Sequence, residues 1–406
     1  MGPQSPCALR VRGGAGPSTS LPLLRDDSHR GRRGASQPTP RRRERDPCHY
    51  SDRLLAVVRP GGDVHAVYGT ALRFKESPDG AKDPGFRVLA LDGGGIRGLF
   101  TASFLSTLEE LGGGRIGEHF DLIVGTSMGG IIALALAYGT PARKVFDLFL
   151  EKGRLVFSRP RRLGMLLRPK YDNRFLAATL REFFGSKTLN DATTPVCVTS
   201  YELENSYPRV WKDEHAADLV PAGDEPAWKV ALASSSAPIF FPGTQVSKGD
   251  SHVDGGLFAN NPSLIGLTEA VRYFRQPLGT IRTLSVGAGE RAERIPYEKA
   301  RRMGVWFWRT AAIEHMLIAQ SRISHEIALR LLDPDLYLRV NVPLERPYAL
   351  DDYDAAKNLI EPGAQAARVL YPDLIRRFFS SAATLGREQK TAVRALRLRD
   401  PSRPHS

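Results

Sequence analysis

Two glycine-rich segments contain the residue types that nucleophilic chemistry requires. The first is Gly125-Thr126-Ser127-Met128-Gly129, which has the spacing G-x-S-x-G. In this spacing the serine lies on a sharp turn between a strand and a helix, and small flanking residues let the backbone pass closely. The apolar run Phe120 to Val124 precedes the motif, and Ile131 to Tyr138 follows it. This context predicts a strand, a tight turn and a helix, with Ser127 as the nucleophile.

The second segment is Asp92-Gly93-Gly94-Gly95-Ile96-Arg97-Gly98, which follows the apolar run Val88 to Leu91. Three glycines between a strand and a helix leave backbone N–H groups unobstructed. Acyl transfer needs such donors to stabilise the negative charge on the tetrahedral intermediate. Arg97 is expected to add positive charge there or to hold the loop in place.

The same glycines permit an alternative. Gly93-x-Gly95-x-x-Gly98 also matches G-x-G-x-x-G, a dinucleotide-binding pattern. The acidic residue that binds ribose in that pattern would fall near Glu109 to Glu118, where no strand precedes it in the required way. The chain also has no G-K-[ST] motif. A nonenzymatic nucleotide-binding protein is therefore the weaker alternative.

A serine nucleophile needs a base. His315 and His325 come late enough for the Ser, acid, His order of α/β-hydrolases, but both fall within a predicted helix rather than a loop. Asp254 is followed by Gly255 and Gly256, which allow close backbone approach. A carboxylate can take the serine proton directly when it lies within hydrogen-bond reach in a dry site. An ordinary Asp-Gly turn remains the competing interpretation, and an esterase with a histidine base remains an alternative function.

The elements around these motifs define the fold class. Strand, glycine-rich turn, helix, strand, tight turn and helix follow one another from Phe86 to Tyr138, which predicts an α/β layered fold with a mainly parallel sheet. Further elements are expected as short strands, as a long helix with Ile313, Leu317, Ile323, Ile327 and Leu331 on an apolar stripe, and as a later helix. The strands are Leu54–Val58, Val64–Tyr68, Pro195–Tyr201, Ile281–Val286 and Tyr337–Val340, and the helices are 305–332 and 363–379.

Composition excludes a transmembrane class. The 406 residues are 42% hydrophobic and 25% charged, and no run of 18 apolar residues occurs. Cys7, Cys48 and Cys197 form no C-x-x-C pair, and no metal site or secretory signal is evident. We expect a cytoplasmic protein without cofactor or metal.

The net charge of +13 is unevenly spread. Residues 1–49 contain ten arginines and four acidic residues, and they have few large apolar side chains. Such a segment cannot bury enough surface to offset its ordering entropy, which predicts a disordered basic tail. An anchor for anionic lipid or nucleic acid and a translation start further downstream are the alternatives.

Together these motifs resemble the patatin-like phospholipase family, whose hallmarks are D-G-G-G-x-R-G, G-x-S-x-G and a late D-G-[GA]. They appear here in order as Asp92 to Gly98, Gly125 to Gly129 and Asp254 to Gly256. Two supporting stretches, Ala233 to Pro242 and Asn260 to Pro262, are also similar. The resemblance covers about residues 86–290. It implies a three-layer α/β/α fold with a mainly parallel central sheet.

The resemblance also implies the chemistry. Ser127 would attack a fatty acyl ester, and Asp254 would act as general base without a histidine. The N–H groups of Gly93, Gly94 and Gly95 would hold the oxyanion beside Arg97. Gly125, Gly129, Gly255 and Gly256 would support these motifs. The substrate implied is a membrane phospholipid, so we expect the protein at the inner face of the membrane and expect no DNA or RNA target.

A narrower similarity links the sequence to bacterial patatin-like effectors of cyclic-oligonucleotide antiphage systems. It implies a cyclic oligonucleotide activator, with Arg301 to Leu332 as the regulatory region, whereas a constitutive lipase is the alternative. We therefore divide the chain into a basic tail, an N-terminal extension, a catalytic core, a C-terminal helical part with a regulatory role, and a second basic tail. These are residues 1–49, 50–84, 85–290, 291–380 and 381–406.

Two further segments combine apolar and basic or aromatic residues. Arg159 to Lys170 mixes basic residues with Leu and Met, which suits either an interfacial lid or a solvated loop whose leucines pack on the core. Trp306-Phe307-Trp308 is an aromatic cluster. Such clusters usually belong to a core or an interface, although bases can also stack on them.

Overall fold

The structure is a computed structural model. It describes residues 55–58, 64–66, 85–158, 160, 168–215, 222–290, 295–344, 348–379 and 381–399. The chain divides into two compact units, 1–49 and 50–406. All described residues belong to the second unit, so the predicted N-terminal tail lies outside the described residues.

Nine strands of the described residues form one sheet in the order β2-β1-β9-β8-β3-β4-β5-β6, and β7 pairs with β5 outside this row. Along this row, neighbouring strands are parallel in the stretch β1-β9-β8-β3-β4-β5. The other three strands, β2, β6 and β7, are antiparallel to the strands they pair with. The predicted mainly parallel sheet is thereby confirmed. The strands are β1 (Leu55–Val58), β2 (Val64–Ala66), β3 (Phe86–Leu91), β4 (Leu122–Thr126), β5 (Val196–Glu202), β6 (Tyr207–Lys212), β7 (His252–Asp254), β8 (Ile281–Val286) and β9 (Tyr337–Val340).

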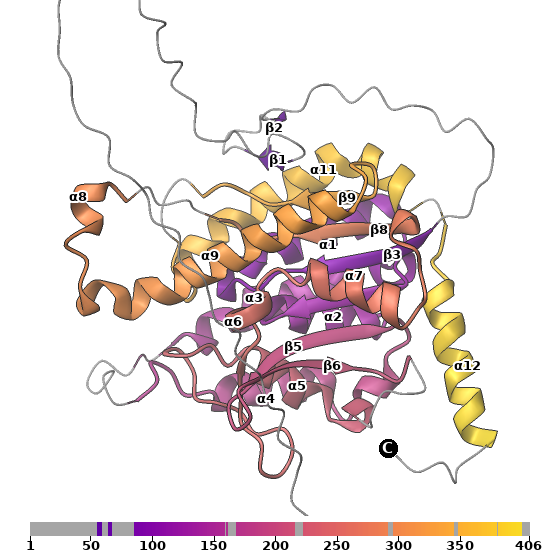
Figure 1. The fold of residues 1–406 in the computed structure, drawn as a ribbon, viewed down its shortest axis with the longest axis horizontal. Coiled ribbons are helices and arrows are strands. Elements are labelled where there is room, and N and C mark those ends of the chain that lie inside the picture. Colours follow the sequence, from indigo (N-terminus) through magenta and orange to yellow (C-terminus); the bar gives the residue numbers. More distant parts are fainter. Residues whose placement is uncertain are drawn as a thin grey trace, which may run out of the picture. The chain divides into compact units, whose positions relative to one another are not determined.

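Helices cover both faces of this sheet. They are α1 (Leu99–Gly112), α2 (Met128–Ala137), α3 (Ala142–Val156), α4 (Arg174–Phe184), α5 (Ala227–Ser234), α6 (Gly256–Ala259), α7 (Ser263–Arg272), α8 (Tyr297–Ala300), α9 (Val305–Leu331), α10 (Tyr353–Ala356), α11 (Ile360–Arg377) and α12 (Leu385–Arg399). In Figure 1, α7 and α9 lie in front of the sheet, whereas α1 and α2 lie behind it.

The alternating direction of the side chains along β3 explains why helices cover both faces of the sheet. Leu89 and Leu91 belong to one buried apolar cluster together with α1 and α2, whereas Val88 belongs to a second cluster with α7 and Ala328 of α9. Successive side chains of a strand point to opposite faces, so a strand such as β3, which is buried along its whole length, must be covered on both sides. The result is the three-layer α/β/α architecture that the sequence predicted.

Several predicted elements have the expected bounds. The strands Ile281–Val286 and Tyr337–Val340 are β8 and β9, and the predicted helix 305–332 is α9. The predicted helix 363–379 is α11, Ile360–Arg377. The two N-terminal strands pair as an antiparallel hairpin, and β1 also extends the central sheet by pairing with β9.

The apolar stripe predicted along α9 is wrong in its second half. Ile313 and Leu317 face the protein, but Ile323 is 54% exposed and Leu331 is 49% exposed. Six residues separate Leu317 from Ile323, which turns the side chain by about 240° around a helix. The buried face continues instead through Ser321, Ser324 and Ala328, so α9 presents polar groups to the core.

The segment 381–406, expected as a basic tail, contains helix α12. The Lys390 ammonium is buried, where it forms an ion pair of 2.6 Å with Asp213 and donates to the Ala192 carbonyl. The Gly386 N–H donates to Asp121 at 3.1 Å. This basic helix is therefore attached to the core by specific polar contacts. Within the described residues, none of the helices is long and apolar enough to span a bilayer.

Candidate active site

Ser127 lies at the turn between β4 and α2, as the G-x-S-x-G motif predicted. Its φ of 55° and ψ of −124° lie outside the common regions for a residue with a side chain. The neighbouring glycines make this turn possible: a Cβ on Gly125 would lie 2.2 Å from the Gly129 carbonyl oxygen, and a Cβ on Gly129 would lie 2.3 Å from the Leu91 oxygen. The strained backbone projects the hydroxyl above the carboxyl end of the sheet.

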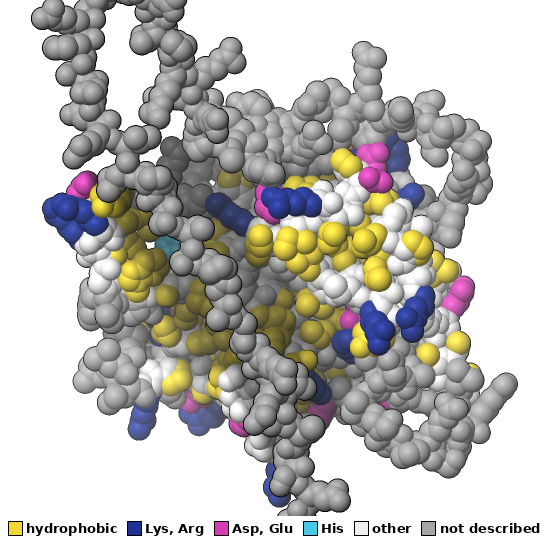
Figure 2. All heavy atoms as spheres, in the orientation of Figure 1, with side chains coloured by type: hydrophobic (Ala, Val, Ile, Leu, Met, Phe, Trp, Pro, Cys, Tyr) yellow, Lys and Arg dark blue, Asp and Glu magenta, His cyan; other side chains and the backbone are white. Residues whose placement is uncertain are grey.

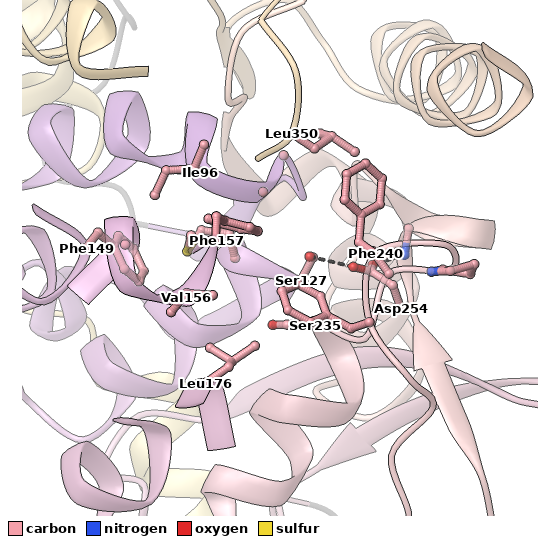
Figure 3. Close-up of a pocket in the computed structure, with 18 of the residues that line it drawn as sticks. Ile96, Ser127, Phe149, Val156, Phe157, Leu176, Ser235, Phe240, Asp254 and Leu350 are labelled. Carbon is pink, nitrogen blue, oxygen red and sulfur yellow. Dashed lines mark hydrogen bonds between the residues drawn. The ribbon is translucent and has the colours of Figure 1, made fainter. Parts of the chain in front are cut away.

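Asp254 is the partner of Ser127 (Figure 3). The Ser127 Oγ donates a hydrogen bond of 2.6 Å to Asp254 Oδ2, although 127 residues separate the two in sequence. Asp254 ends β7, and its second oxygen accepts the Gly256 N–H at 2.7 Å. A Cβ on Gly255 would lie 2.1 Å from Thr199 Oγ1, so only glycine permits this close approach to β5.

The environment of Asp254 changes its acidity. Burial raises the pKa of Asp254 to about 6, against the opposing hydrogen bonds from Ser127 and Gly256. At neutral pH the group is still mainly a carboxylate, but it is a stronger base than an exposed aspartate. A buried carboxylate with a raised pKa beside a serine hydroxyl is suited to accept that hydroxyl's proton.

The glycine loop offers two free donors rather than three. The Gly93 N–H donates to the Asn260 carbonyl at 2.9 Å, so the structure does not leave this predicted donor available. Within the described residues, no hydrogen bond engages the N–H groups of Gly94 and Gly95, and both residues line the cavity at Ser127. Sequence reasoning did not consider Met128, whose N–H begins α2 directly after Ser127 and whose residue also lines this cavity.

Arg97 holds the glycine loop through a hydrogen bond to its backbone. Its buried side chain donates from Nε to the Gly94 carbonyl at 3.2 Å. The Gly94 carbonyl and the Gly95 N–H belong to one peptide plane and point in opposite directions. Fixing the carbonyl therefore fixes the direction of the Gly95 N–H, which favours the loop-holding role over direct contact with the oxyanion.

The glycines are sterically required. A Cβ on Gly94 would lie 2.4 Å from the Ala288 Cβ, and one on Gly95 would lie 2.3 Å from the Leu350 carbonyl oxygen. Gly95 also has a φ of +55°, which side chains disfavour.

An apolar cavity of about 960 Å³, open mouth included, adjoins Ser127 and Asp254. Figure 3 shows Ile96, Phe149, Val156 and Leu176 on the side of Ser127 away from Asp254. Ile313 and Leu317 of α9 and Leu350 also line it, so the site extends beyond residue 290. An apolar cavity with one polar corner fits a fatty acyl chain whose ester reaches the polar end.

The histidines proposed as alternative bases lie elsewhere. His325 is hydrogen-bonded to the Tyr337 hydroxyl at 3.3 Å, and burial and the nearby Arg339 lower its pKa to about 4. The His315 ring lies 5.9 Å from the Trp308 ring. Neither histidine lines the cavity at Ser127.

The nucleotide-binding alternative also loses its ribose-binding group. Glu109 accepts hydrogen bonds from the backbone N–H groups of Ile116 and Ala142, so it holds two chain segments together near the end of α1.

A group of side chains with metal-ligand chemistry lies away from this site. Cys197, His215 and Glu269 are close together and buried. However, the two ring nitrogens of His215 are bonded to Asp213 and Glu269, each at 2.9 Å. Lys212 and Lys390 pair with the same carboxylates. The cluster is thus organised as an ion-pair network.

Two sequence predictions fall partly on undescribed positions. Of the lid or interfacial loop 159–170, residues 159 and 161–167 lie outside the described part of the chain. In the aromatic cluster, the Phe307 ring contacts the Trp308 ring at 5.7 Å, and Trp308 is 43% exposed.

The fold brings a serine hydroxyl, a buried carboxylate and an apolar cavity together, an arrangement that is suited to ester hydrolysis. Comparison with known proteins agrees. A family model described as patatin-like phospholipase matches residues 89–266. A cGAMP-activated phospholipase from Escherichia coli is 32% identical over 74% of this chain and 94% of its own length. Proteins of the same name from Vibrio cholerae and Pseudomonas aeruginosa are 33% and 36% identical, over 77% and 74% of their lengths.

The chain belongs to the patatin-like phospholipase family, and it is a lipid acyl hydrolase. Among solved structures, it is similar to VipD from Legionella pneumophila, with a TM-score of 0.33, 14% identity and coverage of 70% of this chain and 68% of the other. The type III effector ExoU has a TM-score of 0.31 and 17% identity, with coverage of 73% and 54%.

Proposed function

We propose that this enzyme cleaves fatty acyl esters of membrane phospholipids through a dyad of Ser127 and Asp254. The observation that carries the proposal is the hydrogen bond of 2.6 Å between the Ser127 hydroxyl and a buried carboxylate, at the polar corner of an apolar cavity. No histidine lines that cavity among the described residues.

In the first half-reaction, the Ser127 oxygen attacks the ester carbonyl while Asp254 takes the hydroxyl proton. The oxyanion of the tetrahedral intermediate receives hydrogen bonds from the N–H groups of Gly94, Gly95 and Met128. The positive end of α2 adds to this stabilisation. When the intermediate collapses, Asp254 returns the proton to the departing alcohol, which leaves as a lysophospholipid.

In the second half-reaction, water attacks the acyl-enzyme. Asp254 takes a proton from this water and then protonates Ser127 as the fatty acid leaves. The same donors stabilise the second oxyanion. One carboxylate thus performs both proton transfers, which requires that it stay deprotonated between turnovers.

The proposal is tested with purified full-length protein, a fluorophosphonate probe and phospholipid vesicles with product identification. Ser127→Ala and Asp254→Asn are each expected to abolish labelling and fatty acid release. His315→Ala and His325→Ala are expected to retain both. Retained hydrolysis by Asp254→Asn, together with loss in either histidine variant, would overturn the dyad in favour of a histidine base.

We propose further that a cyclic oligonucleotide activates the enzyme in a bacterial defence against phage. The support is that three relatives of 32–36% identity bear the name cGAMP-activated phospholipase. We assign residues 85–290 to the catalytic core and 291–380 to a regulatory part that includes Arg301 to Leu332. The support for a regulatory role of this part is that α9 lines the cavity and contacts the loops of the site.

Nucleotide activation predicts little fatty acid release until the ligand is added. Vesicle hydrolysis is measured with cGAMP, other cyclic di- and trinucleotides, and linear dinucleotides as controls. Strong hydrolysis without nucleotide contradicts gating but leaves the dyad untouched. Addition of DNA or RNA is expected to change nothing.

We propose that the enzyme works in the cytoplasm and binds the inner membrane face reversibly. The region of α8 and the start of α9 combines exposed aromatic residues with exposed cations: Tyr297 is 77% exposed, Trp308 is 43% exposed, and Lys299 and Arg302 lie beside them. Figure 2 shows basic and hydrophobic side chains together at this place. Such a mixture favours anionic lipid surfaces. Vesicle sedimentation tests it: Trp308→Ala and Arg302→Glu are expected to weaken binding to phosphatidylglycerol vesicles.

A further inference from the structure

Helix α9 contacts the two loops on which the proposed chemistry depends. We propose that Gln320 and Ser321 are positioning residues, which hold the acid loop (residues 254–261) and the oxyanion loop (residues 92–95) in register. The inference rests on the proposed dyad, because it concerns the placement of that dyad and of its oxyanion donors.

Gln320 holds the acid loop. Its side-chain amide nitrogen donates to the Leu257 carbonyl, and its oxygen accepts the Asn260 N–H at 3.3 Å. The amide thus bridges the two ends of the short helix α6, which directly follows Asp254 and Gly255. Leu317, one turn earlier on α9, packs over Gly256, where a Cβ would lie 2.7 Å from the leucine side chain. These contacts close the acid loop against solvent.

Ser321 holds the oxyanion loop. Its hydroxyl donates to Asp92 Oδ2 at 3.2 Å and accepts from Arg339 at 3.0 Å. Asp92 directly precedes the glycines of this loop. The Ser321 carbonyl also accepts the Asn261 side-chain amide at 3.3 Å, so this residue contacts the acid loop as well.

Adjacent positions on one helix therefore fix two separate loops. Gly93 and Asn260 are also joined directly by the hydrogen bond from the Gly93 N–H to the Asn260 carbonyl. Two sets of contacts therefore fix the distance between Asp254 and the oxyanion donors. One set runs from α9 to each loop, and the other joins the two loops directly. Because small misplacement of catalytic groups slows the chemical step, loosening either contact is expected to lower kcat more than it changes KM.

The experiment compares Ser321→Ala with Ser324→Ala. Both serines are buried on α9, at 5% and 7% exposure, but Ser324 has no hydrogen bond to either loop within the described residues. Hydrolysis of a soluble p-nitrophenyl ester by the full chain gives kcat and KM without a membrane step. We expect kcat to fall about tenfold in Ser321→Ala, with KM within about twofold, whereas Ser324→Ala stays near the parent.

Gln320→Met keeps the length of the side chain but removes both hydrogen bonds. The acid loop then admits water, which stabilises the charged form of Asp254 and lowers its pKa. We expect the acidic limb of the kcat profile to move to lower pH, together with a lower plateau. A structural role alone would lower the amount of folded enzyme and leave the position of this limb unchanged.

The outcomes separate this inference from the proposed function. If Ser321→Ala matches Ser324→Ala and Gln320→Met has the parental pH profile, the positioning role is overturned, while a dead Ser127→Ala keeps the dyad. If Ser127→Ala remains active, the dyad itself fails. Thermal melting of each variant confirms that equal amounts of folded protein are compared.

Discussion

Arg339 of β9 donates to both carboxylate oxygens of Asp92, the residue that directly precedes the glycines of the oxyanion loop. Both side chains are buried, and the same guanidinium also donates to Ser285 at 2.7 Å. Although burial opposes its charge, Asp92 raises the pKa of Arg339, so the group stays cationic. The pair attaches the oxyanion loop, which follows β3, to β9, which lies two strands away in the sheet.

Removing one partner of this ion pair is expected to lower the free energy of unfolding substantially. Arg339→Met leaves the Asp92 carboxylate buried without its cation, which destabilises a protein by about 3–5 kcal/mol. The measurement is urea unfolding of full-length protein. Arg368→Met is the control, because Arg368 pairs with Glu361 at 2.9 Å but is 51% exposed, and its loss is expected to cost about 0.5 kcal/mol. Equal losses in the two variants would contradict a structural role for the buried pair.

Activity should depend on the ionisation of Asp254. Since the pKa of Asp254 is raised to about 6, the base is lost as pH falls through that value. We expect kcat/KM for a soluble ester to fall about tenfold per pH unit below 6 and to level off above about 7. A profile that remains flat down to pH 5 would show that the essential base has an ordinary carboxylate pKa.

The same rise in pKa means that ionised Asp254 destabilises the folded protein. The ordinary pKa is 3.8, and the folded value is about 6, so the folded state binds more protons between these values. The free energy of unfolding therefore falls as pH rises from about 4 to 6, and the deficit persists above. Asp254→Asn is expected to stabilise the protein at pH 7.5 by about 3 kcal/mol, and by less at pH 4.5. An equal gain at both values would point to a cause other than charge.

The oxyanion loop should not tolerate a methyl group at Gly94. Gly94→Ala would bring a Cβ to 2.4 Å from the Ala288 Cβ, so the loop must shift and move its donors. Because one such donor is worth about 100-fold or more in kcat, we expect a loss of at least this size. Gly279→Ala is the control, since no atom lies within 4 Å of its added Cβ. Comparable activity of both variants would contradict the assigned donors.

The sequence predicted short strands that are rich in apolar residues and mostly buried, such as β3, β8 and β9. It also marked Ser127 and Asp254 by neighbouring glycines whose close contacts no other residue permits. The structure was needed for β7, because His252–Asp254 is only three residues long and forms a strand through pairing with β5.

No pattern in the sequence predicted the residues whose role depends on tertiary contacts. Gln320 and Ser321 occur within a helix whose apolar residues predicted a different buried face. The state of the Gly93 N–H depends on Asn260, 167 positions away, so the sequence could not distinguish it from the donors of Gly94 and Gly95. In the same way, a segment with a basic composition gave no sign that Lys390 would be buried.

The contact between α12 and the core leads to the last prediction. Lys390 is 3% exposed and pairs with Asp213, which is fully buried. Burial opposes the charge of Asp213, but Lys390 and His215 lower its pKa to about 2. Lys390→Met removes one of these two cations, and we expect it to reduce the free energy of unfolding by about 3 kcal/mol. Since Lys390 does not line the cavity at Ser127, kcat per folded molecule should stay unchanged. Lys357→Met, whose side chain is 43% exposed, is the control, and a loss of kcat without a loss of stability would place α12 in the catalytic machinery instead.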